Sequence, residues 1–271
     1  MKSDQEITSD CIVIAFYGIH ATAASLKSFY NDLINWFDAI QCPPDKLSIK
    51  GPGFSGKPVS FGRTHSRLSK DDFSQLESIN IYSMLPDGKI PTVDWWATAS
   101  ISLKRNPFFF IQARSSLVAL EDERTIRLVE NCASALNPDY GIGYHLNHNK
   151  GPGFYAIGLN YVTIDNITGD DDEETEAVSK WGYEGMAREV YKDGMIRDIY
   201  PFNYLTEPHL KMQINQYTLK DWIVADSSRG SLSKINDQMT LWEVSPQQIG
   251  QIRKILFESG IIFDWRIYEQ E

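Results

Sequence analysis

The chain has 271 residues, of which 42% are hydrophobic, 12% aromatic and 23% charged, so its composition is that of a folded globular protein and not of a disordered one. Its 36 acidic and 26 basic residues give a formal charge of −10, which disfavours direct nucleic-acid binding because phosphate contacts require clustered Lys and Arg. No stretch approaches the roughly 18 apolar residues that a membrane span needs, and the N-terminal apolar run is too short for a signal peptide. We therefore expect a cytoplasmic protein.

The chain begins with a predicted strand and helix. Cys11–Tyr17 is a continuous apolar run of β-type residues, which is typical of a buried strand. Apolar residues then recur at helical spacing over residues 22–40, with Thr22 or Ser25 as the N-cap and Pro43 beyond the end. We expect this helix to pack on the first strand.

An antiparallel meander is predicted next, followed by a second helix. Turn sequences separate three β-rich runs, which are Ile79–Leu85, Val93–Leu103 and Phe108–Ser115. Acidic residues then open a helix over residues 121–136, whose apolar stripe is predicted as Ile126, Val129, Cys132, Ala133 and Leu136. A further strand is expected at Tyr140–Leu146.

The second half is less regular. It suggests a strand at Tyr155–Ile164, a helix over Glu174–Val190 and a strand at Met239–Val244. A helix capped by Ser245 and ended by Gly260 follows, and a final strand is predicted at Ile261–Tyr268. The whole order predicts an α+β fold, with a mostly antiparallel sheet and helices packed on one face. Two closely packed subdomains are expected, 1–150 and 151–271, although one compact domain is also compatible because no flexible linker separates them.

The pentapeptide Lys-Gly-Pro-Gly-Phe occurs twice, at residues 50–54 and 150–154. Two similarly built turns leading into strands would explain the repeat. The first copy also matches the glycine pattern of dinucleotide-binding loops, through Gly51, Gly53 and Gly56. However, Pro58 follows closely and blocks the helix that such a loop must open, so nucleotide binding is disfavoured.

His145 and His148 form the best candidate for a metal site or a catalytic centre. No third ligand stands at a diagnostic spacing, although Asp165 or Asp170 could approach in space, so structural histidines are the favoured interpretation and no cofactor is predicted. The cysteines do not suggest a metal site either, because Cys11, Cys42 and Cys132 are too widely spaced for a zinc site or a disulfide scaffold. We expect them to be buried thiols. The sequence also contains no nucleophile motif, so we expect a protein that is not an enzyme.

Two features are candidates for binding a protein partner. The first is an acidic run that would engage a basic surface, although charge runs are commonly just solvated; it consists of Asp170, Asp171, Asp172, Glu173, Glu174 and Glu176. The second is Trp96. Strand alternation places Trp95 with Ala97 and Ala99 on the apolar face, and therefore places Trp96 on the polar face. There it would be covered by the second half of the chain or would anchor an interface.

Two segments resemble bacterial immunity proteins of polymorphic-toxin and type VI secretion systems. These segments are Ala135–Asn147, with the sequence ALNPDYGIGYHLN, and Gly230–Val244, with the sequence GSLSKINDQMTLWEV. The chain is similar to the Immunity protein 52 family of α+β proteins. This resemblance implies a cytoplasmic, non-enzymatic inhibitor that occludes the active site of a cognate toxin, a nuclease being the favoured kind. The alternative hypothesis is a small-molecule hydrolase or transferase centred on His145 and His148.

Overall fold

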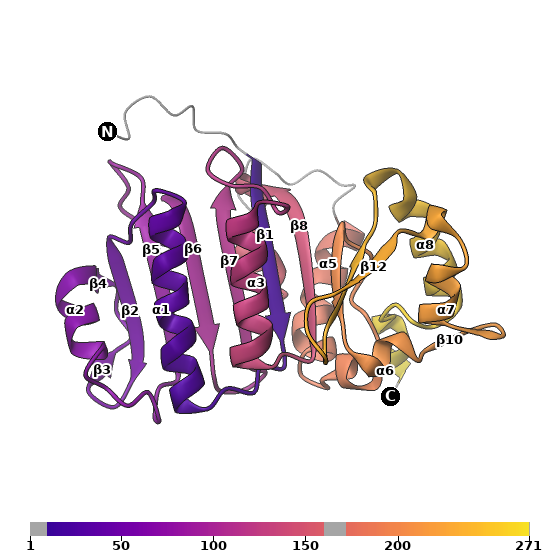
Figure 1. Ribbon diagram of the computed structural model, residues 1–271, viewed down its shortest axis with the longest axis horizontal. Helices are drawn as coiled ribbons and strands as arrows, with labels where there is room; N and C mark the ends of the chain where they lie inside the picture. Colours follow the sequence, from indigo (N-terminus) through magenta and orange to yellow (C-terminus); the bar gives the residue numbers. More distant parts are fainter. Residues whose placement is uncertain (1–9, 160–171, 271) are drawn as a thin grey trace.

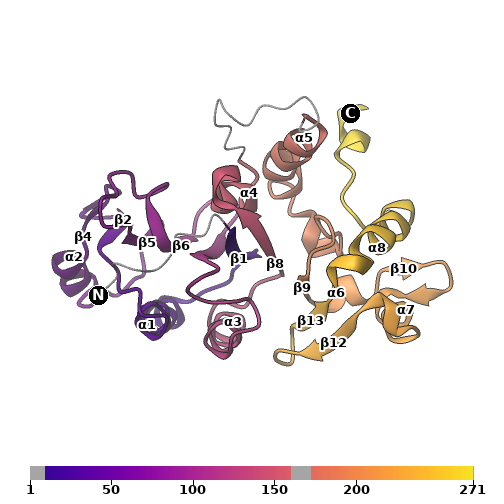
Figure 2. The ribbon, with the colours of Figure 1, turned by 90° about the horizontal axis from the view of Figure 1, so that it is seen from above.

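The computed structural model describes residues 10–159 and 172–270. Within these residues, eleven strands form one sheet in the order β12-β13-β9-β8-β1-β7-β6-β5-β2-β3, with β4 also paired to β2 (Figures 1 and 2). Every pairing between neighbours is antiparallel. The predicted α+β fold with a mostly antiparallel sheet is confirmed.

The first half of the chain follows the sequence prediction closely. Helix α1 begins after Thr22, whose hydroxyl accepts a hydrogen bond from the Ser25 backbone N–H at 3.1 Å, while the Ser25 hydroxyl accepts one from the Thr22 N–H. Asp122 caps α3 in a similar way through the Arg124 N–H. The elements are β1 (Asp10–Tyr17), α1 (Ala23–Ala39), β2 (Lys46–Gly51), β3 (Phe54–Ser55), β4 (Val59–Ser60), α2 (Phe61–Leu68), β5 (Ser78–Met84), β6 (Trp95–Ser102), β7 (Phe108–Arg114), α3 (Glu123–Leu136) and β8 (Tyr140–Asn147).

The sheet separates two hydrophobic cores. Because side chains alternate along a strand, Ile12, Ile14 and Phe16 of β1 belong to one core, and Val13, Ala15 and Tyr17 belong to the second. Figure 2 shows α1 and α3 on one side of the sheet and α4 and α5 on the other. We call the two cores the α1/α3 core and the α4 core. The expectation of helices on one face therefore describes the first half of the chain, and α4 (Pro152–Ala156) covers part of the opposite face.

The second half extends the same sheet. Strand β9 pairs with β8, and β13 and β12 follow it outward, so hydrogen bonds of the sheet connect residues on both sides of the expected boundary at 150/151. Helix α8 starts at a capping box on Ser245 and is followed by Gly260 at φ +69°, as predicted. The elements here are α5 (Asp172–Lys180), β9 (Phe202–Leu205), α6 (Glu207–Leu210), β10 (Gln213–Ile214), β11 (Tyr217–Thr218), α7 (Leu219–Val224), β12 (Ser231–Lys234), β13 (Thr240–Glu243) and α8 (Pro246–Glu258).

Two strands expected in the second half do not form where the structure describes their residues. Residues 152–156 form α4 in place of the start of a strand, and residues 160–164 lie outside the described residues. At the C-terminus only the bridge between Ile196 and Ile262 forms, and Trp265–Gln270 makes a 3-10 turn. Both segments are short apolar runs, and periodicity cannot distinguish such a run in a strand from one buried in another conformation.

The helix expected over Glu174–Val190 is shorter and interrupted. Helix α5 ends at Lys180 and continues as a π-turn over Trp181–Gly185, in which the Met186 N–H donates to the Trp181 carbonyl at 2.8 Å. A 3-10 turn follows at Val190–Asp193. The chain then runs without regular structure to β9, and Ile196, Ile199 and Tyr200 of this segment belong to the α4 core.

Candidate functional site

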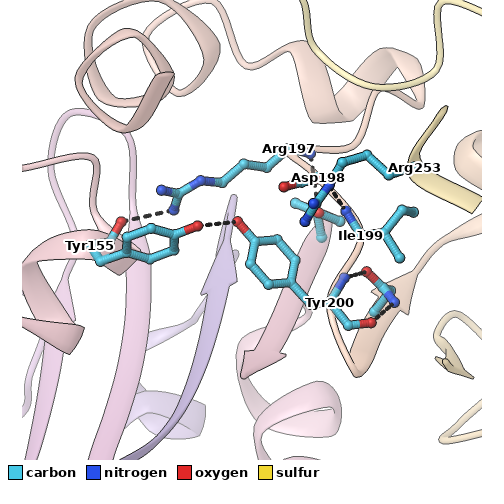
Figure 3. Close-up of polar contacts among 8 residues, drawn as sticks. Tyr155, Arg197, Asp198, Ile199, Tyr200 and Arg253 are labelled. Carbon is cyan, nitrogen blue, oxygen red and sulfur yellow. Dashed lines mark hydrogen bonds and ion pairs between the residues drawn. The ribbon is translucent and has the colours of Figure 1, made fainter. Parts of the chain in front are cut away.

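A buried arginine lies at the centre of the α4 core (Figure 3). Arg197 is only 7% exposed. Its guanidinium Nη1 donates to the backbone carbonyls of Tyr155 at 2.8 Å and Ala156 at 3.1 Å, and its Cζ lies 4.3 Å from the centre of the Tyr155 ring. Arginine is charged in proteins at any ordinary pH. The positive charge therefore sits at the C-terminal carbonyls of α4, where the helix dipole favours it.

Tyrosine hydroxyls bind α4 from the sheet side. Tyr17 donates to the Ala156 carbonyl and Tyr144 to the Pro152 carbonyl, each at 2.7 Å. Burial raises the pKa of both tyrosines, so their hydroxyls are neutral donors. A helix of five residues has no stability of its own. These hydrogen bonds, together with those from Arg197, hold α4 in place.

The segment around Arg197 is fastened to its neighbours by further polar contacts. Figure 3 shows the Tyr155 and Tyr200 hydroxyls, 3.1 Å apart, and the ion pair of 2.6 Å between Asp198 and Arg253 of α8. The Asn203 side chain accepts from the Tyr200 N–H and donates to the Tyr200 carbonyl. Side-chain hydrogen bonds thus satisfy backbone groups of a segment that has no regular secondary structure.

A cavity of about 110 Å³ opens beside α4, between β6, β7 and the turn that precedes α4. Gln112 of β7 forms one wall and is 6% exposed. Its Nε2 donates to the Thr98 hydroxyl at 3.0 Å, whereas its Oε1 has no hydrogen-bond partner among the described residues. The other lining residues are Thr92, Val93, Trp95, His148, Asn149, Gly151, Pro152, Gly153 and Phe154.

His148 forms another part of the wall. Its ring lies edge to face with Trp95, with 4.8 Å between the ring centroids. Burial lowers the pKa of His148 to about 4, and the positive charge of Arg114 acts in the same direction, so the ring is neutral at pH 7. Its Nδ1 is buried without a hydrogen-bond partner in the described part of the chain.

The two candidate histidines are not brought together. His145 pairs in register with Ile12 and therefore lies on the α1/α3 side of the sheet, whereas Gln112 of the cavity pairs with Val13 of the α4 core. The His145 Nδ1 lies 3.4 Å from the Asp10 carboxylate at the surface. Within residues 10–159 and 172–270, no group of three or more possible metal ligands occurs. The arrangement that a hydrolase or transferase centred on both histidines would need is therefore not present.

The prediction that Trp96 lies on the polar face of β6 was wrong. The register of β5 against β6 shifts between Ser83 and Met84, so that Met84 pairs with Trp95. This bulge places Trp96 in the α1/α3 core with Ala97, at 3% exposure, and sends Trp95 to the cavity on the opposite face. Because Trp96 is covered by its own core, it cannot anchor a partner in this conformation.

Part of the acidic run can be placed. Asp170 and Asp171 lie outside the described residues, and the run continues into the first turns of α5, where the backbone of Asp172, Glu173 and Glu174 is helical. Glu176 is exposed. Helix α5 lies beside α4, on the side of the sheet opposite α1 and α3 (Figure 2). Whether these acids bind a partner stays a prediction.

The repeated pentapeptide adopts two different conformations. Residues 50–54 form the hairpin between β2 and β3, in which Gly51 pairs with Phe54. Residues 150–154 instead lead from a 3-10 turn into α4, and Gly153 packs so closely on β7 that a Cβ there would lie 2.8 Å from the Phe110 ring. The expectation of two similar turns into strands holds only for the first copy.

Sequence reasoning did not single out Arg197, Gln112 or the buried His209. His209 is fully enclosed, stacks on Tyr140 with 5.2 Å between centroids, and has its Nδ1 3.0 Å from the Thr206 hydroxyl. The one signal for Arg197 is its place between the apolar residues Ile196 and Ile199. Nothing in the sequence marks Gln112, since polar residues alternate with apolar ones on many half-exposed strands.

Comparison with known proteins supports the fold. The structure is similar to that of the Pseudomonas aeruginosa T6SS protein PA0821, with a TM-score of 0.59 and 14% sequence identity over 97% of this chain and 77% of that one. No protein-family model matches the sequence, so the resemblance to Immunity protein 52 is not confirmed. None of the curated proteins matches it either. In the described residues, no helix has the length and hydropathy required to cross a membrane.

Proposed function

We propose that this protein is a cytoplasmic immunity protein that binds a cognate toxin of a type VI secretion system and blocks its active site. The observation that carries the proposal is the likeness of fold to a T6SS protein over 97% of the chain. The resemblance of residues 135–147 and 230–244 to immunity proteins supports it independently. The proposed action is binding, so no catalytic residue is required.

The charge of the chain fits such a target. A toxin that cleaves nucleic acid must attract phosphates, so its active-site cleft is basic, and a protein with a formal charge of −10 complements it. Complementary charge increases the rate of association, which protects a cell in which free toxin is lethal. This argument favours a nuclease over a toxin with an acidic or apolar active site.

The contact region that we favour is the surface around α5. Acidic residues open this helix, and three apolar side chains near it are exposed, namely Leu159 at 44%, Tyr183 at 71% and Ile267 at 65%. Gly158 packs against Gly182, which brings the positions before Leu159 and Tyr183 together. The Lys180 ammonium lies 5.2 Å from the Trp265 ring centroid, which joins α5 to the turn that carries Ile267. We call this region the α5 surface. Apolar residues with a charged rim are typical of protein interfaces.

The decisive experiment is a pull-down from the native bacterium with this protein as bait, followed by identification of the partner by mass spectrometry. We expect a basic partner encoded with a type VI secretion system, at equal stoichiometry and with binding that weakens at high salt. The purified partner should damage DNA, RNA or another cellular target, and this activity should stop when the protein is added. A captured protein whose activity is unaffected would contradict the proposal.

Charge-reversal variants test the contact region. Glu174→Lys with Glu176→Lys should weaken binding by about tenfold or more, because each reversal near a basic partner removes an attraction and adds a repulsion. Glu121→Lys with Glu130→Lys makes the same change in net charge on exposed residues at α3 and is the matched control. Equal losses in both variants would mean that only total charge matters. An unchanged affinity in the first variant would place the contact elsewhere.

A further inference from the structure

Basic residues of this acidic chain gather at one end of the molecule. Residues 46–70 contain six Lys and Arg and no Asp or Glu, so this segment carries a formal charge of +6 although the whole chain carries −10. It runs from β2 through β3 and β4 to α2, which Figure 1 shows at the end of the molecule remote from α7 and α8. Exposed charges farther apart than about 8 Å are largely screened from one another at physiological ionic strength. The net charge of the chain therefore does not describe the field at this end.

The fold brings a second basic segment, Lys104-Arg105, beside the first. Strand β5 lies between β2 and β6, so Lys50 and Ser102 are two strand spacings apart, which is about 10 Å. Glu77 connects the two segments, since its carboxylate lies 3.1 Å from the Lys50 ammonium and 2.6 Å from the Lys104 ammonium. Lys50, Lys104 and Arg105 line one cleft with Glu77. One acid among three cations leaves this cleft positive.

Helix α2 adds two arginines beside the hairpin of β2 and β3. The Arg67 Cζ lies 4.4 Å from the centre of the Phe54 ring, and a Cβ on Gly53 would lie 2.6 Å from the Arg67 Nη2. Arg63 precedes Arg67 by one helical turn, so both side chains project from the same side of α2. We define the basic surface as six exposed residues, namely Lys50, Lys57, Arg63, Arg67, Lys104 and Arg105.

Four of these six cations have no acidic partner in the described part of the chain. No carboxylate lies within 4.0 Å of the side-chain nitrogens of Lys57, Arg105 or the two α2 arginines. By contrast, Arg253 of α8 pairs with Asp198 at 2.6 Å. Like charges one helical turn apart destabilise a helix, and self-repulsion opposes the folded state. An anionic ligand on the basic surface would remove this repulsion.

Aromatic rings among the cations restrict the kind of anion. The Phe54 ring is half-buried against the Arg67 guanidinium, and the half-buried Phe61 ring stacks on His65 with 4.9 Å between centroids. Unpaired bases stack on aromatic rings and guanidinium planes, while Lys and Arg contact the phosphates. An acidic protein segment would use the charges alone. We propose that the basic surface binds single-stranded nucleic acid, through its phosphates and without reading its sequence.

Fluorescence anisotropy with the full-length protein alone tests this proposal, which goes beyond the proposed function and needs no toxin. The probe is a labelled oligothymidylate of about 12 nucleotides, within the range of known single-strand sites. We expect saturable binding at low salt. The logarithm of the association constant should fall with the logarithm of the salt concentration with a slope of about −3 to −4, because each phosphate contact contributes about −0.7.

Two competitors of matched charge identify the ligand class. An oligomer of abasic deoxyribose phosphates should bind about tenfold more weakly than oligothymidylate, because it has no bases to stack. A polyglutamate peptide should also bind about tenfold or more weakly. Equal binding of polyglutamate would assign the surface to an acidic protein and overturn the proposal. Equal binding of the abasic oligomer, or no binding of oligothymidylate, would overturn it as well.

Two double variants locate the contact. Lys57→Gln with Arg63→Gln removes exposed side chains that have no acidic partner within the described residues, so the fold should be retained. Binding of oligothymidylate should weaken by about tenfold, and the salt slope should become shallower by about 1.4. Lys220→Gln with Lys254→Gln makes the same change in net charge at exposed positions of α7 and α8 and should leave the affinity within about twofold. Equal losses in both double variants would overturn the assignment to the basic surface.

A single variant tests the stacking. Phe54→Leu keeps an apolar side chain beneath Arg67 but removes the ring. It should weaken oligothymidylate by about threefold or more and leave the abasic oligomer unchanged, since only bases stack. Circular dichroism checks that the variant is folded. An equal loss with both oligomers, or no loss with either, would show that the ring does not contact bases and would contradict the proposal.

Discussion

The α1/α3 core and the α4 core lie on opposite faces of one sheet and are built differently. The first is closed by two regular helices, and its buried side chains are almost entirely apolar. The second is closed by α4, a π-turn and irregular segments, and it encloses Arg197, His209 and several tyrosine hydroxyls. The side chains of strand β1 point alternately into the two cores.

The difference follows from how each covering segment satisfies its backbone. A regular helix pairs its own N–H and C=O groups, so its buried face can be apolar. Irregular segments cannot do this, and their buried carbonyls need donors from elsewhere. Tyr17, Tyr144 and Arg197 supply those donors in the α4 core. Polar burial on this side therefore compensates for the loss of regular structure.

The largest effect is expected from a truncation in the α1/α3 core. Phe29 of α1 is fully buried and lies edge to face with Phe109, with 4.9 Å between ring centroids. Phe29→Ala should lower the free energy of unfolding by about 3–5 kcal/mol, because it removes apolar contacts and leaves a cavity. Urea denaturation measures this change. A loss below about 1 kcal/mol would mean that this core is not closely packed.

A smaller and more local effect is expected in the α4 core. Arg197→Met should lower the free energy of unfolding by about 2 kcal/mol, because two charge-assisted hydrogen bonds are lost while the cost of burying the charge is relieved. Hydrogen exchange should become faster in residues 152–158, with little change in α1. Arg197→Lys is the control, since it keeps the charge without the planar fork of donors. An equally stable Arg197→Met variant would show that the arginine is not what holds α4.

The smallest effect is a pH dependence caused by His148. Its pKa is lowered to about 4 in the folded protein, from the ordinary value of 6.5, so the unfolded chain binds more protons between these values. Protonation therefore favours the unfolded chain as the pH falls from 6.5 toward about 4. The free energy of unfolding should decrease by about 1–2 kcal/mol between pH 7 and pH 5. His148→Phe should reduce the difference in unfolding free energy between these two pH values by that amount.

Val93→Ala is the control for the pH experiment, because it changes the packing of the same cavity without altering a titratable group. It should keep the pH dependence of the unchanged protein. If His148→Phe also kept it, the imidazole would be as accessible to protons in the folded chain as in the unfolded one. The α4 side of the sheet would then have no pH-dependent stability caused by His148.

The sequence by itself determined the elements that satisfy themselves locally. Thr22 and Ser245 mark helix starts, Gly260 marks a helix end, and apolar periodicity identifies α1, α3 and the strands β1 and β5–β8. These signals act over a few residues, so they are readable without the rest of the chain. The details were less secure, since Ile126 of the expected α3 stripe is 43% exposed, and Thr125 and Leu128 face the core instead.

Only the tertiary structure decided the features that depend on contacts between residues far apart in the chain. One pentapeptide forms a hairpin at residue 50 and a helix start at residue 150, because Gly153 meets Phe110 of β7 and Pro152 meets Tyr144 of β8. A bulge between β5 and β6 exchanged the faces of Trp95 and Trp96. The cavity exists only because α4, β6 and β7 meet around Gln112 and His148. Such contacts join residues far apart in the chain, and no local pattern records which of them will form.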